Sequence, residues 1–147
     1  MRQTMQVSMG GAPICTEFKV QHADADSYGV VHFSRYASLI ETCFLEYLQE
    51  RGITIESLRI EGYELRVREL HLKYLAPSRP KDVLLLSCGL AHVGIASLTF
   101  NVQMSKRSRD SIDAAHVLVG IVNIALVNSA NGSPTPLPRT FVEHLGR

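Results

Sequence analysis

The chain has 147 residues, of which 46% are hydrophobic, and its formal net charge at pH 7 is +1. This length suits one domain with a single core, and the composition is that of an ordinary globular protein. Acidic and basic residues nearly balance, so no overall positive field attracts nucleic acid, and no apolar run approaches the ~18 residues that span a membrane.

Residues 1–13 lack the long apolar stretch of a signal peptide, so we expect a loose tail there and one domain over residues 14–147. The cysteines Cys15, Cys43 and Cys88 are widely spaced, odd in number and set within apolar runs. This pattern predicts reduced cysteines in the core and argues against a disulfide framework or a zinc site. We therefore expect a cytoplasmic protein with no nucleic-acid partner and no membrane partner.

A strand is predicted over residues 14–21, because apolar and polar residues alternate there. A polar loop with the sequence DADSYGVV follows at residues 24–31 and leads into a helix. The helix is predicted from apolar residues that recur three and four positions apart. These residues are Tyr36, Leu39, Ile40, Cys43, Phe44, Tyr47 and Leu48. Gly52 lies where this helix should end, since glycine readily adopts the left-handed conformation that closes a last helical turn.

The rest of the chain predicts four more strands. The first begins at Tyr63, and its alternation changes phase near Arg68 and Glu69, which predicts a β-bulge there. The other three strands are predicted over residues 83–91, 98–104 and 115–127. Connections are expected as a helical turn near 56–59, a proline turn at 76–82, a hairpin at 92–94, a charged turn at 106–110 and a final helical turn at 141–147.

This order of elements predicts an α+β domain in which an antiparallel sheet of about five long strands wraps around one central helix. The apolar stripe of the helix and the inner face of the sheet can then bury each other. The last strand is apolar on both faces, so we expect another subunit to cover its outer face.

The loop at residues 24–31 carries two aspartates to the start of the helix, where free backbone N–H groups and the helix dipole can hold a developing negative charge. A simpler alternative is that Asp24 or Asp26 merely caps backbone N–H groups. A calcium loop is excluded, because Tyr28 and Arg35 occupy positions that require calcium ligands. The chain also lacks the motifs of serine hydrolases, P-loop proteins and Rossmann proteins.

Two motifs occur at the spacing that one known family shows: DADSYGVV at residues 24–31, followed by Tyr36, and YLAPSR at residues 74–79. Together with the order of elements, they resemble the hotdog-fold acyl-CoA thioesterases of the 4-hydroxybenzoyl-CoA thioesterase type, over roughly residues 14–139. The resemblance implies a hotdog fold, hydrolysis of a thioester, and a homodimer or homotetramer with active sites at the subunit interface. It implies no metal and no organic cofactor.

By this resemblance, Asp26 is the catalytic carboxylate, whereas we regard Asp24 as structural. Phe33 stands where the oxyanion-binding backbone N–H of the family belongs, with Gly29 and Val30 in the adjoining loop beside the substrate; a glycine lets the substrate approach the backbone closely. Thioester hydrolysis needs a group that attacks the carbonyl or activates water, and a donor for the oxyanion that forms. Either role, nucleophile or general base, is open to Asp26.

His32 adjoins the proposed oxyanion donor and is expected either to contact the substrate or to be a polar group at a helix start. Some relatives carry a site histidine one position later, where this chain has Phe33. Arg35 can meet a substrate phosphate or carboxylate, pair with a residue such as Glu69, or be solvated. Tyr36 is expected in the core.

Recognition of the acyl carrier departs from the type enzyme of this family. Its basic cluster for the CoA phosphates corresponds here to residues 92–95, with the sequence HVGI. Two other basic groups can bind the CoA nucleotide or the acidic helix of an acyl carrier protein, unless they are simply solvated turns. One group is Lys106, Arg107 and Arg109, and the other is Arg79 and Lys81.

The prediction is therefore a thioesterase that acts on an acyl or aroyl thioester of CoA or of an acyl carrier protein. Two alternatives stay open. One is a non-catalytic module that binds an acyl thioester, and the other is a hotdog hydratase or dehydratase that pairs His32 with Asp26.

Overall fold

The computed structural model describes residues 13–107 and 115–146. Five strands, three α-helices and one 3-10 helix are formed there. In chain order they are β1 (Ile14–Lys19), η1 (His22–Asp24), α1 (Phe33–Gln49), α2 (Ile55–Ile60), β2 (Tyr63–Tyr74), β3 (Val83–Val93), β4 (Ser97–Lys106), β5 (Ala115–Asn128) and α3 (Arg139–Leu145). The predicted tail lies almost wholly outside the described residues, as does most of the charged turn after β4.

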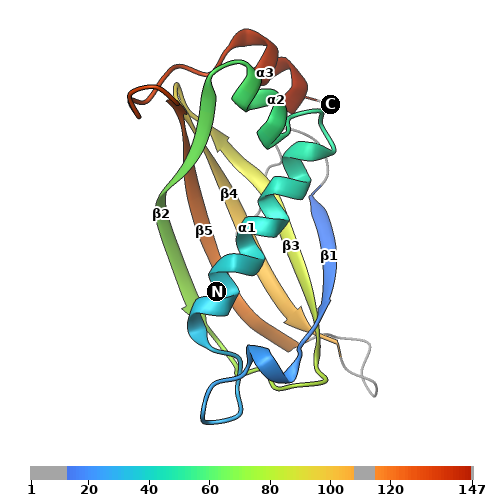
Figure 1. The fold of residues 1–147 in the computed structure, drawn as a ribbon. Coiled ribbons are helices and arrows are strands. Elements are labelled where there is room, and N and C mark those ends of the chain that lie inside the picture. The colour runs from blue at the N-terminus through green and yellow to red at the C-terminus, as the bar shows by residue number, and fades with distance from the viewer. Residues whose placement is uncertain (1–12, 108–114, 147) are drawn as a thin grey trace.

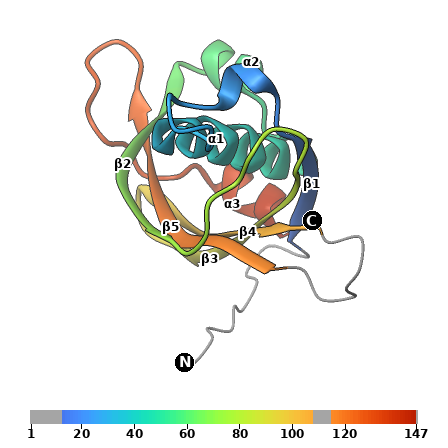
Figure 2. The same ribbon diagram turned by 90° about the horizontal axis from the view of Figure 1, so that it is seen from below.

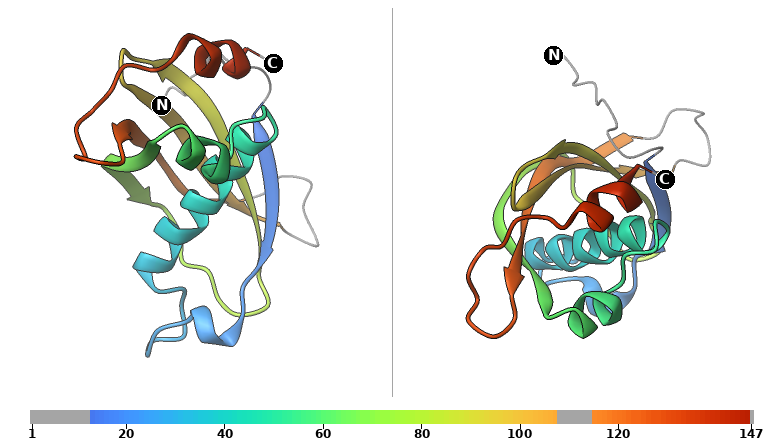
Figure 3. Two further views of the ribbon diagram at one scale, coloured as in Figure 1. Left: turned by 45° about the horizontal axis from the view of Figure 1, so that its top comes forward. Right: turned by 90° about the horizontal axis from the view of Figure 1, so that it is seen from above.

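The strands form one antiparallel sheet with the order β1-β3-β4-β5-β2. Figure 1 shows α1 lying across the concave face of this sheet, and Figure 2 shows the sheet curving around the helix. The two short helices α2 and α3 lie at the end of the molecule where α1 finishes, as both views of Figure 3 show. The expected α+β architecture, a sheet wrapped around one helix, is confirmed.

Helix α1 packs against the sheet through the apolar stripe that the sequence predicts. All seven residues of the stripe are buried, and Phe44 and Tyr47 both pack against Phe100 of β4. Burial of an apolar side chain of this size stabilises the fold by roughly 1.5–3 kcal/mol. Gly52 follows the helix with a φ of 82°, so the predicted left-handed position is confirmed.

The predicted bulge in β2 is also confirmed. The pairing between β2 and β5 shifts register between Val67 and Glu69, which leaves Arg68 as the extra residue. The shift places Val67 and Leu70, three positions apart, on the same face of β2, where both side chains are exposed in the single chain.

The end of β5 pairs with the segment that follows it. Pro134 forms a β-bridge with Val127, and the Thr135 N–H donates to the Leu126 carbonyl at 2.9 Å. The segment after β5 therefore folds back along the last residues of that strand. Earlier in the same strand, Ile121 is exposed, and the covering of the outer face by another subunit stays a prediction.

One prediction about the cysteines is wrong. Cys43 and Cys88 are buried, but Cys15 is exposed, because alternate residues of β1 face solvent. The Cys88 thiol donates a hydrogen bond to the Cys43 sulfur, which lowers the pKa of Cys43. The same hydrogen bond, together with burial, raises the pKa of Cys88, so both thiols act as core packing groups.

One edge of the sheet is open. Strand β2 forms one edge of the sheet, and over its 12 residues no other described strand pairs with its outer side. None of the described helices is both long and apolar enough to cross a membrane.

Candidate active site

The polar loop between β1 and α1 is a small hairpin. Ala25 and Val31 form an antiparallel bridge, and the Asp26 N–H donates to the Val30 carbonyl at 2.8 Å. Gly29 turns the chain at the tip with a φ of 77°, a conformation that glycine adopts without strain. A side chain added at Gly29 would meet no atom within 4 Å, so open space lies beside the tip.

The Asp26 carboxylate is oriented by this hairpin. Its Oδ1 accepts hydrogen bonds from the Tyr28 N–H at 2.8 Å and from the Val30 N–H at 3.4 Å. Its Oδ2 has no hydrogen-bond partner among the described residues, and the side chain is half-buried. One oxygen is thus held by the loop while the other is available to a ligand.

Helix α1 begins beside the hairpin, and its first turn is capped by a histidine. The His32 Nδ1 accepts from the Ser34 N–H at 3.2 Å, and the His32 carbonyl accepts from the Arg35 N–H at 2.9 Å. The Phe33 N–H makes no hydrogen bond within the described chain, so it is an available donor at the positive end of the helix dipole. The cap of α1 is thus His32 and neither aspartate. Asp24 and Asp26 do accept backbone N–H groups, from Gln21 and from Tyr28 and Val30, as the simpler alternative expects.

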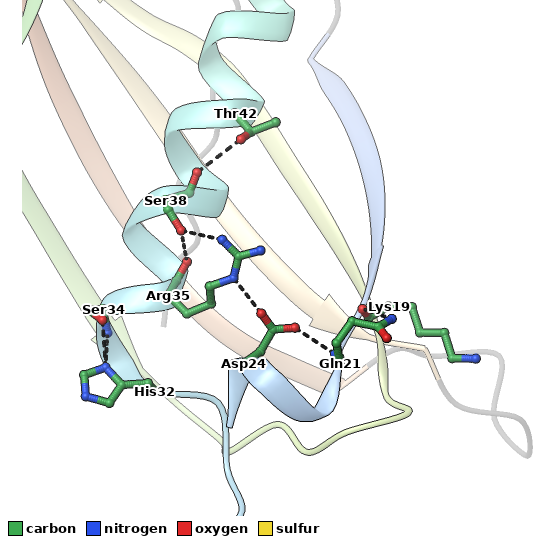
Figure 4. Close-up of polar contacts among 8 residues, drawn as sticks. All are labelled: Lys19, Gln21, Asp24, His32, Ser34, Arg35, Ser38 and Thr42. Carbon is green, nitrogen blue, oxygen red and sulfur yellow. Dashed lines mark hydrogen bonds and ion pairs between the residues drawn. The ribbon is translucent and has the colours of Figure 1, made fainter. Parts of the chain in front are cut away.

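Asp24 has the structural role that we expected. It accepts from the Arg35 Nε at 2.8 Å through one oxygen and from the Gln21 N–H at 2.7 Å through the other, as Figure 4 shows. Arg35 therefore pairs with Asp24 and not with Glu69. This ion pair ties β1 and η1 to the first turn of α1.

His32 is not paired with the neighbouring carboxylate. Its ring stacks on the Phe33 ring with 4.5 Å between centroids, and its Nδ1 lies 2.7 Å from the Ser34 hydroxyl. The Nδ1 also accepts the Ser34 N–H, so this ring nitrogen is engaged in the cap of α1. No contact joins His32 to Asp26 in this arrangement, whereas the hydratase alternative requires an acid and a histidine to work together.

The second motif packs beneath the site, a role that sequence reasoning did not assign. The Tyr74 hydroxyl donates to the Phe33 carbonyl at 3.3 Å, and the Val31 N–H donates to the Ser78 carbonyl at 2.8 Å. Tyr36 stacks obliquely on Tyr74 and is buried, which raises the pKa of its hydroxyl. Tyr36 therefore stays protonated and belongs to the core, as predicted.

Large apolar side chains around this site face solvent in the single chain. Tyr28 is 86% exposed and Phe33 is 66% exposed, and Tyr74 and Leu75 are also exposed. Apolar side chains gathered in one place on a surface mark a site where a ligand or another chain binds.

A groove of about 390 Å³ runs between α1, α2 and β2, farther along the helix from the hairpin. This volume falls in the range of small-molecule sites. Its lining mixes polar and apolar groups, with Glu41, Arg59, Glu64 and Arg66 as the charged members. The apolar lining residues are Phe44, Leu45, Ile55, Leu58, Leu65, Val67 and Ile124, joined by Tyr63.

No metal centre is formed in the described part of the chain, where no three His, Cys, Asp or Glu side chains gather closely enough to hold an ion. What the arrangement offers chemically is a carboxylate with one free oxygen, a free helix N–H and an apolar surface around them. These are the groups that hydrolysis of an activated acyl group requires.

Comparison with known proteins shows which family has this fold and these motifs. The family model of the thioesterase-like superfamily matches residues 20–145. The acyl-CoA thioester hydrolase YbgC of Escherichia coli is 26% identical over 124 residues, which cover 84% of this chain and 89% of that protein. An acyl-acyl carrier protein thioesterase of Arabidopsis thaliana is 28% identical over 85 residues, 58% of this chain and 45% of that protein.

Among solved structures, 4-hydroxybenzoyl CoA thioesterase from Pseudomonas sp. strain CBS-3 superimposes with a TM-score of 0.83. The alignment covers 91% of this chain and 99% of that chain at 13% sequence identity. At this identity the likeness shows the fold, and the expected hotdog fold is confirmed.

Proposed function

The chain belongs to the thioesterase-like superfamily, and we propose that it is a thioester hydrolase in which Asp26 is the catalytic carboxylate. The proposed substrate is an acyl or aroyl thioester of CoA or of an acyl carrier protein, and the products are the free acid and the carrier thiol. The observation that carries this proposal is the Asp26 carboxylate, which the loop orients through Oδ1 while Oδ2 is left unpartnered.

Two routes use the free oxygen of Asp26. As a nucleophile, Oδ2 attacks the thioester carbonyl, the carbon–sulfur bond breaks to release the thiolate, and water then hydrolyses the mixed anhydride. As a general base, Oδ2 accepts a proton from a water molecule that attacks the same carbon, and the carbon–sulfur bond then breaks as the carrier thiol takes up that proton and leaves. Both routes place negative charge on the carbonyl oxygen.

The Phe33 N–H is the proposed donor to that oxygen. It is free, it lies at the positive end of α1, and it needs no reorganisation to donate. Tyr74 supports this arrangement, because its hydroxyl binds the Phe33 carbonyl and so fixes the same turn. Gly29 and Val30 are proposed to line the approach of the substrate along the hairpin, and His32 to orient this turn.

We also propose that the active enzyme is a homodimer or homotetramer. The β2 edge is unpaired on its outer side within the described chain, and Val67, Leu70 and Tyr74 on this strand are exposed. A long edge strand with exposed apolar residues favours pairing with another chain. A second copy on this edge would cover the apolar surface beside the site and the groove along α1.

The test is a hydrolysis panel of acyl-CoA and acyl-carrier-protein thioesters with the wild type and the Asp26→Asn variant. Asparagine keeps an oxygen that can accept the Tyr28 N–H, so the hairpin should fold unchanged. Losing the carboxylate should lower the rate by about 10²–10⁴-fold. Asp24→Asn is the matched control, since it makes the same chemical change two residues away and should leave most of the rate.

Wild-type activity that survives Asp26→Asn would remove Asp26 from the mechanism. Binding of every thioester without turnover would instead favour the non-catalytic acyl-binding module.

A further inference from the structure

We infer that Arg79 and Lys81 bind the phosphate groups of CoA, an inference that rests on the proposed thioester hydrolase function. The structure distinguishes the two basic groups that the sequence leaves open, apart from Arg109, which lies outside the described residues. Lys106 donates to the Pro77 carbonyl at 2.9 Å and lies 3.3 Å from the Asp82 carboxylate. Arg107 is paired with Glu17, so these two cations are already neutralised within the chain.

The side chains of Arg79 and Lys81 make no ion pair or hydrogen bond within the described residues, and both residues are exposed. The one carboxylate in their turn, Asp82, is used elsewhere. Its Oδ2 accepts from the Arg79 backbone N–H at 2.8 Å and also faces Lys106. Two positive charges next to each other are therefore left without an anion.

The backbone of this turn is strained at Lys81. The Asp82 N–H donates to the Arg79 carbonyl at 3.1 Å, Pro80 occupies the second position, and Lys81 has a φ of 81° at the third. This is the geometry of a type II turn, whose third position favours glycine because other residues are strained there. The chain nevertheless carries a lysine at this position, which is consistent with a role for its side chain.

The turn is also rigidly held. The Lys81 N–H donates to the Val20 carbonyl at 3.0 Å, and the Val20 N–H donates to the Asp82 carbonyl at 2.9 Å. These bonds tie the turn to the end of β1. A cation on a fixed backbone loses less conformational freedom when it binds an anion than one on a mobile loop.

The position of Arg79 and Lys81 relative to the proposed catalytic residues suits the shape of a CoA thioester. In CoA, the pantetheine arm separates the thioester from the phosphates, so the phosphate site must lie to one side of Asp26. The segment from Tyr74 to Asp82 begins at the first turn of α1, contacts the hairpin through Ser78, and ends beside β1. Figure 2 shows this segment crossing beneath α1 toward β1.

The chemistry of the pair matches phosphate. An arginine guanidinium donates two parallel hydrogen bonds to phosphate oxygens, and a lysine ammonium adds a compact charge. Phosphate carried on a nucleotide is the ligand class that these residues fit.

The test compares two thioesters of one acyl group: the CoA thioester, and the N-acetylcysteamine thioester, which has neither nucleotide nor phosphate. The variants are Lys81→Gly, Arg79→Ala and the two combined. Lys81→Gly relieves the backbone strain as it removes the charge, so loss of folding cannot explain its effect. Arg139→Ala is the control, because it removes one exposed cation from α3 at the other end of the molecule.

For the combined variant we expect the KM for the CoA thioester to rise by about tenfold, with kcat and the KM for the N-acetylcysteamine thioester unchanged. Weaker binding of free CoA, measured by calorimetry, should accompany this change, and it tests the inference even if the wild type hydrolyses neither thioester. Absent hydrolysis alone would refute the proposed function. The phosphate site would be overturned by an unchanged KM together with an unchanged affinity for CoA, or by an equal rise in KM for both thioesters.

Discussion

The two ends of helix α1 differ in how deeply their side chains are buried. At the first turn, His32 and Phe33 are exposed and the Phe33 N–H is free. In the last turns, Phe44, Tyr47 and Leu48 are buried against the sheet. One helix therefore combines an open end, where we propose the chemistry, with a packed end that anchors the fold.

At the packed end, a buried cation also lies beside the negative end of the α1 dipole. Arg51 is buried, donates from its guanidinium to the Tyr47 carbonyl at 3.1 Å, and lies over the Tyr47 ring at 3.6 Å from its centroid. A cation is favoured at the negative end of a helix dipole. The comparison teaches that changes at the packed end should cost stability, whereas changes at the open end should cost activity.

The largest expected loss of stability comes from Leu48→Ala at the packed end. Removing a buried leucine side chain leaves a cavity and should lower the free energy of unfolding by about 2–5 kcal/mol. Denaturant unfolding measures this change. Ile60→Ala removes similar atoms from an exposed position and should change the free energy of unfolding by less than about 0.5 kcal/mol. Equal losses in both variants would contradict the comparison.

Gly29→Ala tests the open end through the backbone. Alanine at a φ of 77° is strained, which should lower the free energy of unfolding by about 1–2 kcal/mol. The added Cβ meets open space, so no clash adds to this cost. We also expect kcat/KM to fall, because the tip of the hairpin orients Asp26. Gly89→Ala is the control, as its φ lies outside the left-handed range, and it should leave both quantities nearly unchanged.

The smallest effect is expected at His32, where two substitutions separate capping from catalysis. His32→Ala removes the acceptor for the Ser34 N–H and should lower the free energy of unfolding by about 1 kcal/mol. His32→Asn restores an acceptor and should recover that stability with a hydrolysis rate within a few-fold of wild type. If His32 were a general acid or base, both variants would lose about 10²-fold or more in rate, and the asparagine would not rescue it.

Local pattern was enough to predict most of the fold. The stripe from Tyr36 to Leu48, the left-handed Gly52 and the bulge near Arg68 all follow from periodicity and backbone sterics, which act between residues close together in the chain. The same alternation would have revealed that Cys15 faces solvent, since it shares the outer face of its strand with Glu17. Apolar neighbours along the chain do not mean burial when successive side chains point to opposite faces.

The sequence alone thus determined a helix inside an antiparallel sheet, and its resemblance to a known family singled out Asp26, Gly29 and Phe33 as a group. Only the tertiary structure decided which partners these groups have: that Asp24 takes Arg35, that His32 caps α1, and that Tyr74 reaches the Phe33 carbonyl. It also decided which cations are neutralised and which are free. The physical reason is that hydrogen bonds and ion pairs between residues distant in sequence depend on how the strands and loops come together in space, and no local pattern carries that information.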